Sequence, residues 1–214
     1  MHGTDYEINR IAQVLMRESA HFRHAALHQL ERLSGDASGR SYYRIHTLHA
    51  PVATAILMLA GNPHPPLSPG AVNLSLENTF MDVGLFLKKS GIPVPEIYAH
   101  DPQHSAFLVE DVGEISLNLA ATQASSISAQ RLFEKAAEII LKIQRLPANS
   151  GCLAFKKRFQ HEQYLTEASR FVELYLKPEG LLQEHWPFIL HELDLISRAV
   201  AAHPRALTLS LIHI

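Results

Sequence analysis

The sequence has little cysteine, no long apolar run and no excess of charge of either sign. Its 214 residues include one cysteine, Cys152, so an internal disulfide and a cluster of metal-bound thiolates are both excluded. No apolar run approaches the roughly eighteen residues that a membrane-spanning helix needs. The formal net charge of −2 provides no basic field for nucleic acid or for an anionic membrane. We therefore expect neither nucleic acid nor a membrane among its partners.

The N-terminal stretch MHGTDYEINRIAQ lacks the basic start and the apolar run of a signal peptide. Together with the single cysteine, this predicts a cytoplasmic protein. A hydrophobic fraction of 47% over 214 residues is typical of a globular chain with one or two domains.

Histidine is abundant, with 14 copies, which raises the question of metal binding. His21, His24 and His28 have the i, i+3, i+7 spacing of one helix face. No further ligand follows at a zinc-like spacing, and the H-E-x-x-H motif is absent from the sequence. The pattern predicts a solvated polar face and no metal site. His100 and His104, which flank an Asp-Pro turn, are likewise expected to be exposed.

The order of the predicted elements indicates an α+β fold. Periodicity and capping residues predict helices over about 4–16, 22–34, 74–90, 127–146, 157–177 and 180–202, the last interrupted near Trp186 and Pro187. Strands are predicted over 40–48, 52–59 and 105–113, residues 92–101 are expected to be extended chain that leads into a strand, and the proline-rich stretch 60–70 is a loop. Because the strands are confined to the first half, we expect a small antiparallel sheet with one inserted helix, followed by an all-helical part.

The stretch LSGDASGRSYYRIH, residues 33–46, places small residues from Gly35 to Gly39 directly before a β-rich run. Small side chains let backbone N–H groups approach a phosphate group. The stretch lacks the G-K-[ST] of a P-loop, and its G-x-x-x-G spacing is not the dinucleotide fingerprint. A phosphate-binding loop and an ordinary hairpin turn are both open at this point, because hairpin turns use the same residues.

Three motifs in this order, LSGDASGRSYYRI, GIPVPEIYAHD and AFLVEDVGEISL, resemble those of the aminoglycoside phosphotransferase-like kinases, a protein-kinase-like family. Within the family they are most similar to the bacterial cell-wall amino-sugar kinases, which phosphorylate N-acetylmuramate and N-acetylglucosamine at the anomeric hydroxyl. The resemblance covers roughly residues 8–208. It implies a kinase-like N-lobe over 1–110 and a hinge with a partial helical C-lobe over 111–208.

The resemblance also implies where ATP binds. It places the loop that covers the phosphates at Gly35, Asp36, Ala37, Ser38, Gly39 and Arg40. The connector whose backbone pairs with the adenine edge corresponds to Glu110, Asp111 and Val112, and Glu77 is the candidate carboxylate on the inserted helix. Because the adenine contacts are backbone ones, the Asp111 carboxylate is expected to matter little for binding. From the residues alone, a plain strand end and a solvated surface glutamate are the alternatives.

Two departures from the family pattern bear on the substrate and on catalysis. The strand ATAILMLAGNP has no lysine of the V-A-I-K type, which favours the amino-sugar branch over the antibiotic-modifying one and leaves the phosphate-holding cation unassigned. No H-x-D-x-x-x-x-N pattern occurs in the sequence. The catalytic aspartate and the Asn and Asp ligands of Mg²⁺ are therefore expected beyond residue 214.

The stretch LSLIHI, residues 209–214, resembles the translation of a widely used transposon sequencing adaptor, which implies that these residues are a non-native tail. The alternative is a native strand that leads into the catalytic loop, with His213 as its histidine. Both interpretations predict a fragment of an ATP- and Mg²⁺-dependent sugar kinase that does not transfer phosphate by itself. A non-catalytic nucleotide-binding or interaction module is the other function that the sequence leaves open, and an aminoglycoside antibiotic is the other substrate.

Overall fold

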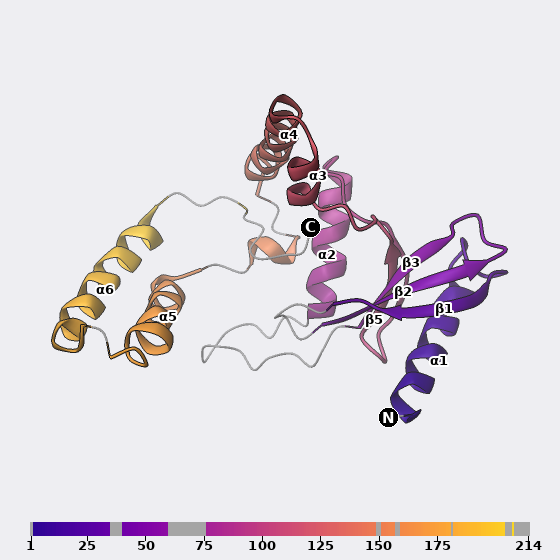
Figure 1. Cartoon of the computed structure of the whole chain (residues 1–214), viewed down its shortest axis with the longest axis horizontal. Helices are drawn as coiled ribbons and strands as arrows, with labels where there is room; N and C mark the ends of the chain where they lie inside the picture. Colours follow the sequence, from indigo (N-terminus) through magenta and orange to yellow (C-terminus); the bar gives the residue numbers. More distant parts are fainter. Residues whose placement is uncertain are drawn as a thin grey trace. The chain divides into compact units, whose positions relative to one another are not determined.

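The computed structural model describes residues 2–34, 40–59, 76–148, 151–156, 159–180, 182–203 and 207. The chain divides into two compact units, the first reaching Ile143 and the second beginning at Gln144 (Figure 1). The lobe boundary predicted near residue 110 falls inside the first unit and stays a prediction.

The first unit is built on a five-stranded antiparallel sheet. Its elements are α1 (His2–Glu18), β1 (Ala26–Arg32), β2 (Ser41–Leu48), β3 (Thr54–Leu59), α2 (Leu76–Lys89), β4 (Ile97–Asp101), β5 (Ala106–Glu110), α3 (Leu117–Gln123) and α4 (Ser126–Gln144). The strands pair in the order β1-β2-β3-β5-β4, and every pair is antiparallel. This arrangement confirms the predicted α+β class, with α2 inserted between β3 and β4.

Helix α1 covers one face of the sheet. Its apolar residues recur at helical spacing, and Ile8, Ile11, Ala12, Leu15 and Met16 are all buried. They form one core cluster with alternate residues of the central strands, namely Tyr43, Ile45, Ala55, Leu57, Ala106 and Leu108. Successive side chains of a strand point to opposite faces of the sheet, so these residues lie on the face that α1 covers and their neighbours in sequence lie on the other face.

Helix α2 supplies the apolar cover of the opposite face. Phe80 and Met81 of α2 pack against Met58, Phe107 and Val109. The rings of Phe80 and Phe107 meet edge-on, with centroids 5.0 Å apart. Because β5 is buried on both faces, its sequence is a continuous apolar run rather than an alternating one.

The helix predicted over residues 22–34 is wrong, because residues Ala26–Arg32 form strand β1. Leu27 and Leu30, three residues apart, both pack against the core on the α1 side. In a regular strand this spacing would place them on opposite faces, but the pairing with β2 shifts between Leu27 and Gln29. The bulge therefore produces an apolar spacing that is also typical of a helix.

The loss of this helix also removes the histidine face. His21 and His24 lie in the turns before β1, and His28 lies at its bulge; all three are exposed, as predicted. The expected exposure of His100 and His104 is wrong, because both are half-buried. The His100 ring stacks on Phe107 at 4.3 Å between centroids, and His104 Nδ1 lies 2.7 Å from an Asp101 carboxylate oxygen.

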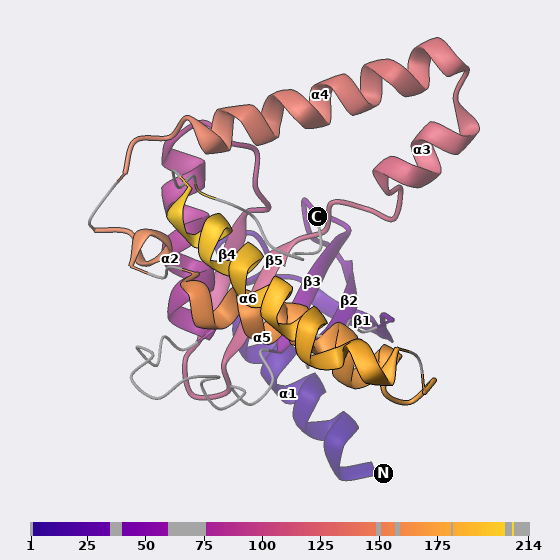
Figure 2. The ribbon, with the colours of Figure 1, turned by 90° about the vertical axis from the view of Figure 1, so that its left-hand side faces the viewer.

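The second unit is helical. It contains a short 3₁₀ turn (Leu153–Phe155), α5 (His161–Phe171) with a π-helical continuation (Val172–Leu176), a second 3₁₀ turn (Gln183–His185) and α6 (Trp186–Ala202). Helices α5 and α6 lie side by side (Figure 2) and are joined by a hydrogen bond of 2.6 Å between His161 and Asp194. Pro187 stands in the first turn of α6, where a missing N–H costs nothing, so the predicted interruption is the start of this helix. No helix in the described part of the chain has the length and apolar composition to cross a membrane.

Candidate functional site

The turn that follows β5 is fixed by hydrogen bonds on both of its sides. On the strand side, the Glu110 N–H donates to the Glu96 carbonyl at 2.8 Å, and the Glu110 carboxylate accepts from the Glu96 N–H at 3.0 Å. On the other side, Asp111 Oδ1 accepts from the Gly113 N–H at 3.0 Å. This side-chain bond spans Val112 and closes an Asx turn, a conformation that Asp adopts readily. Gly113 has φ +87°, which a glycine adopts without strain.

Arg44 of β2 holds the carboxylate of this turn. Its Nε donates to Asp111 Oδ2 at 2.7 Å and its Nη2 approaches Oδ1 at 3.3 Å, while its Nη1 donates to Glu114. Arg44 is opposite Ile56 of β3, which in turn is opposite Val109 of β5. The arginine therefore lies on the α2 side of the sheet.

The ion pair is charged at neutral pH. Burial alone would raise the pKa of Asp111, but hydrogen bonds from Arg44, the Gly113 N–H and the Thr54 hydroxyl outweigh it and leave this pKa below its ordinary value. Hydrogen bonds to Asp111 and Glu114 raise the pKa of Arg44. The side chains of Arg44 and Asp111 are 10% and 7% exposed, whereas that of Glu114 is 74% exposed. Asp111 is thus the permanent partner and Glu114 a solvated one.

The structure brings Glu110, Asp111 and Val112 together in the turn. Val112 is 68% exposed, and its backbone N–H and C=O make no hydrogen bond within the described part of the chain. The Glu110 carboxylate accepts a hydrogen bond from Glu96, the residue that directly precedes β4, so this carboxylate has a local structural role.

The other predicted site residues are placed only in part. Gly35, Asp36, Ala37, Ser38 and Gly39 lie outside the described residues. They connect β1 to β2, whose pairing extends to a 2.9 Å bond from the Leu33 N–H to the Tyr42 carbonyl. Arg40, half-buried, directly precedes β2. Glu77 belongs to the first turn of α2, and its side chain lies outside the described residues.

Sequence reasoning missed Arg44, Thr54 and Glu114, and it gave the Asp111 carboxylate no role. One signal was present: Arg44 interrupts the strand-like run SYYRIHTL at a position whose neighbours, Tyr43 and Ile45, are buried on the other face. A charged residue inside a central strand needs a partner of opposite charge. The register of β2, β3 and β5 places the acidic stretch after β5 next to Arg44, and Asp111 in that stretch is the partner.

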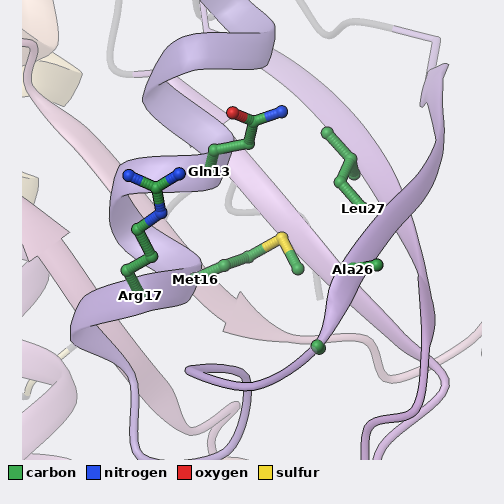
Figure 3. A pocket seen from close by; sticks show the side chains of 6 residues that line it. Gln13, Met16, Arg17, Ala26 and Leu27 are labelled. Carbon is green, nitrogen blue, oxygen red and sulfur yellow. The ribbon is translucent and has the colours of Figure 1, made fainter.

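A hollow of about 290 Å³ lies between α1 and β1 (Figure 3). Gln13, Met16 and Arg17 of α1 line it together with Ala25, Ala26 and Leu27. It is at the small end of the range for ligand cavities, and it lies on the α1 side of the sheet, away from Arg44. It therefore forms no part of the site around Asp111.

Replacing Gly113 with alanine should lower the free energy of unfolding by about 1 kcal/mol, because the φ of +87° strains an L side chain although an added Cβ meets no atom within 4 Å. Urea denaturation followed by circular dichroism measures the loss. Gly84→Ala inside α2 is the matched control: its Cβ would meet Ile97 at 3.6 Å, an ordinary contact, and should stabilise the helix by up to about 1 kcal/mol. Equal effects at the two glycines would contradict the strained turn.

No protein-family model matches the chain, and no curated protein matches it. Among the residues that the structure describes, no group of three or more His, Cys, Asp or Glu side chains is placed to hold a metal ion.

Proposed function

We propose that this chain is the nucleotide-binding part of an ATP-dependent phosphotransferase that acts on a sugar hydroxyl. One observation carries the proposal: a fixed turn directly after β5 presents the exposed Val112 with a backbone donor and acceptor that have no partner in the described part of the chain. Exposed backbone groups on a rigid turn are suited to the hydrogen-bonding edge of a purine base. The Glu110 to Val112 turn is then the adenine-binding connector.

The position of the β1–β2 connection supports the same proposal. Ser41, the first residue of β2, lies in the same row as Leu59 and Ala106, and Ile45 lies in the same row as Ala55 and Glu110, the last residue of β5. Four residues of strand separate the two rows, about 13 Å. A nucleotide whose base contacts the turn extends over such a distance toward residues 35–40, where we propose that the phosphates are covered.

Arg40 is the cation that we assign to the phosphates. Its guanidinium pairs with no carboxylate among the described residues, and a guanidinium can donate two parallel hydrogen bonds to a phosphate group. Arg44 is not available in this way, because Asp111 already neutralises it. Mg²⁺ would neutralise further phosphate charge, and we assign none of its ligands to the described residues.

We propose amino sugars of the cell wall as the substrate class, on the resemblance of the three sequence motifs and on the strand without lysine. Since the sequence holds no H-x-D-x-x-x-x-N pattern, we assign ATP binding, and not phosphoryl transfer, to this chain. A non-catalytic nucleotide-binding module would bind ATP equally well.

A proline at position 112 tests the turn. Val112→Pro removes the backbone N–H and should weaken the binding of a fluorescent ATP analogue roughly three- to tenfold, the value of one hydrogen bond. Val112→Ala keeps the N–H and should bind as the wild-type chain does. Circular dichroism controls for folding of both variants.

Two results would count against the proposed function. A folded wild-type chain that does not bind the ATP analogue would remove its basis. Equal affinities of the proline and alanine variants would show that the base does not use the N–H of residue 112.

A further inference from the structure

The conformation of Val112 is determined by its neighbours. Its side chain is exposed, and its backbone has no hydrogen bond of its own in the described part of the chain. The hydrogen bond between the Glu110 carboxylate and the Glu96 N–H fixes the backbone before Val112. The bond from the Gly113 N–H to Asp111 Oδ1 fixes the backbone after it. The direction of the Val112 backbone groups therefore depends on the orientation of the Asp111 carboxylate.

Arg44 fixes that orientation. Two N–H groups of one planar guanidinium approach the two oxygens of Asp111, at 2.7 and 3.3 Å, which restrains rotation of the carboxylate. The same guanidinium donates through Nη1 to Glu114, on the far side of Gly113. One side chain from β2 thus binds the turn at both of its ends, 67 and 70 residues away along the sequence.

We infer that Arg44 is a positioning residue for the nucleotide. Arg44 does not touch the base, but it holds the turn in the conformation in which the backbone N–H and C=O of Val112 face the base. This inference rests on the proposed function, because it deepens the role of the same turn. Asp111 contributes most of the restraint, since its side chain is buried with that of Arg44, and the exposed Glu114 contributes less.

The inference requires arginine specifically. A lysine at position 44 keeps the positive charge and the aliphatic stem, but its ammonium is a point charge and cannot form two parallel bonds with one carboxylate. Arg44→Lys therefore separates the charge, which is retained, from the orientation of Asp111, which is not. Ile45→Val, the next residue of β2, is the matched control, because Ile45 is buried on the opposite face of the sheet.

The experiment measures two quantities for the wild-type chain and both variants: the dissociation constant of a fluorescent ATP analogue, and amide hydrogen exchange at Gly113 by NMR. For Arg44→Lys we expect roughly three- to tenfold weaker binding, the value of one misdirected hydrogen bond, together with faster exchange at Gly113. For Ile45→Val we expect wild-type values of both. Urea denaturation of each variant shows that it is folded.

The outcomes separate this inference from the proposed function. Unchanged affinity of Arg44→Lys, or equal loss in Ile45→Val, would overturn the positioning role while ATP binding by the wild-type chain stands. A wild-type chain that binds no nucleotide would overturn the proposed function, and the positioning of a nucleotide with it. Exchange at Gly113 is independent of the ligand, so an unchanged rate in Arg44→Lys would overturn the restraint of the turn in either case.

Discussion

Arg44→Met should lower the free energy of unfolding of the first unit by about 3–5 kcal/mol at neutral pH. The Asp111 side chain is only 7% exposed, so its charge would stay buried after the guanidinium is removed. The Thr54 hydroxyl and the Gly113 N–H are neutral partners and do not replace a counter-ion. Methionine has an unbranched apolar side chain that fills much of the space of the arginine stem. The loss therefore reports the uncompensated charge rather than a cavity.

The effect of Arg44→Met should shrink as the pH falls, first through the raised pKa of Asp111 in the variant and then through its lowered pKa in the wild-type protein. In the wild-type protein the pKa of Asp111 is lowered, so this carboxylate stabilises the fold above its unfolded pKa, and the contribution is lost as the pH falls through the folded pKa. In the variant, burial without the guanidinium should raise the pKa of Asp111 above its unfolded value. Stability of the variant then falls as the pH rises, and the two curves converge in acid.

Urea denaturation at several pH values between about 3 and about 7 tests this prediction. The single tryptophan, Trp186, belongs to the second unit, so circular dichroism or amide NMR is the appropriate measurement for the first unit. Glu114→Gln is the control: its side chain is 74% exposed, and its loss should cost less than about 1 kcal/mol. A loss in Arg44→Met that is the same at all pH values would contradict the buried ion pair.

Phe107→Ala should have the other large effect, a loss of about 3–5 kcal/mol. Phe107 is fully buried in β5, where its ring meets Phe80 of α2 at 5.0 Å and stacks on His100 of β4 at 4.3 Å. Truncation removes both ring contacts and leaves a cavity under α2. Amide exchange in α2 should therefore rise more than in α1, which packs on the opposite face.

Phe107→Leu provides the graded comparison, because it keeps an apolar side chain of intermediate volume. It should cost less than Phe107→Ala, since a smaller cavity remains. Denaturation with urea gives both losses. A cost of under about 1 kcal/mol for Phe107→Ala would mean that α2 is not held to the sheet through this ring.

The regular elements of the fold were predictable because their patterns are local. Strands β2 and β3 follow from β-rich runs, and α1, α2 and α4 from apolar residues at helical spacing. Strand β1 was mistaken for a helix because its bulge gives Leu27 and Leu30 a helical spacing. A bulge depends on the partner strand, which a single segment of sequence does not reveal.

The polar end of the strand over 105–113 was predictable from its acidic residues and glycine, but the turn that begins at Asp111 and its support were not. Arg44 and Asp111 are 67 residues apart, and only the register of β2, β3 and β5 brings them to the same face. Arg44 is unusual in its own strand, but nothing in that segment indicates which residue is its partner. Long-range ion pairs of this kind require the sheet topology, whereas a capping box or an Asx turn is visible in a few consecutive residues.

The two bulges of the sheet lie on its two outer strands. Strands β1 and β4 form the edges, and their pairing shifts at His28 and at Tyr98, while the inner pairs are regular. An edge strand with a straight row of free N–H and C=O groups invites strand addition by another chain. A bulge twists this row and interrupts its spacing. Both edges are therefore poor templates for intermolecular β-pairing, which protects the sheet from edge-to-edge aggregation.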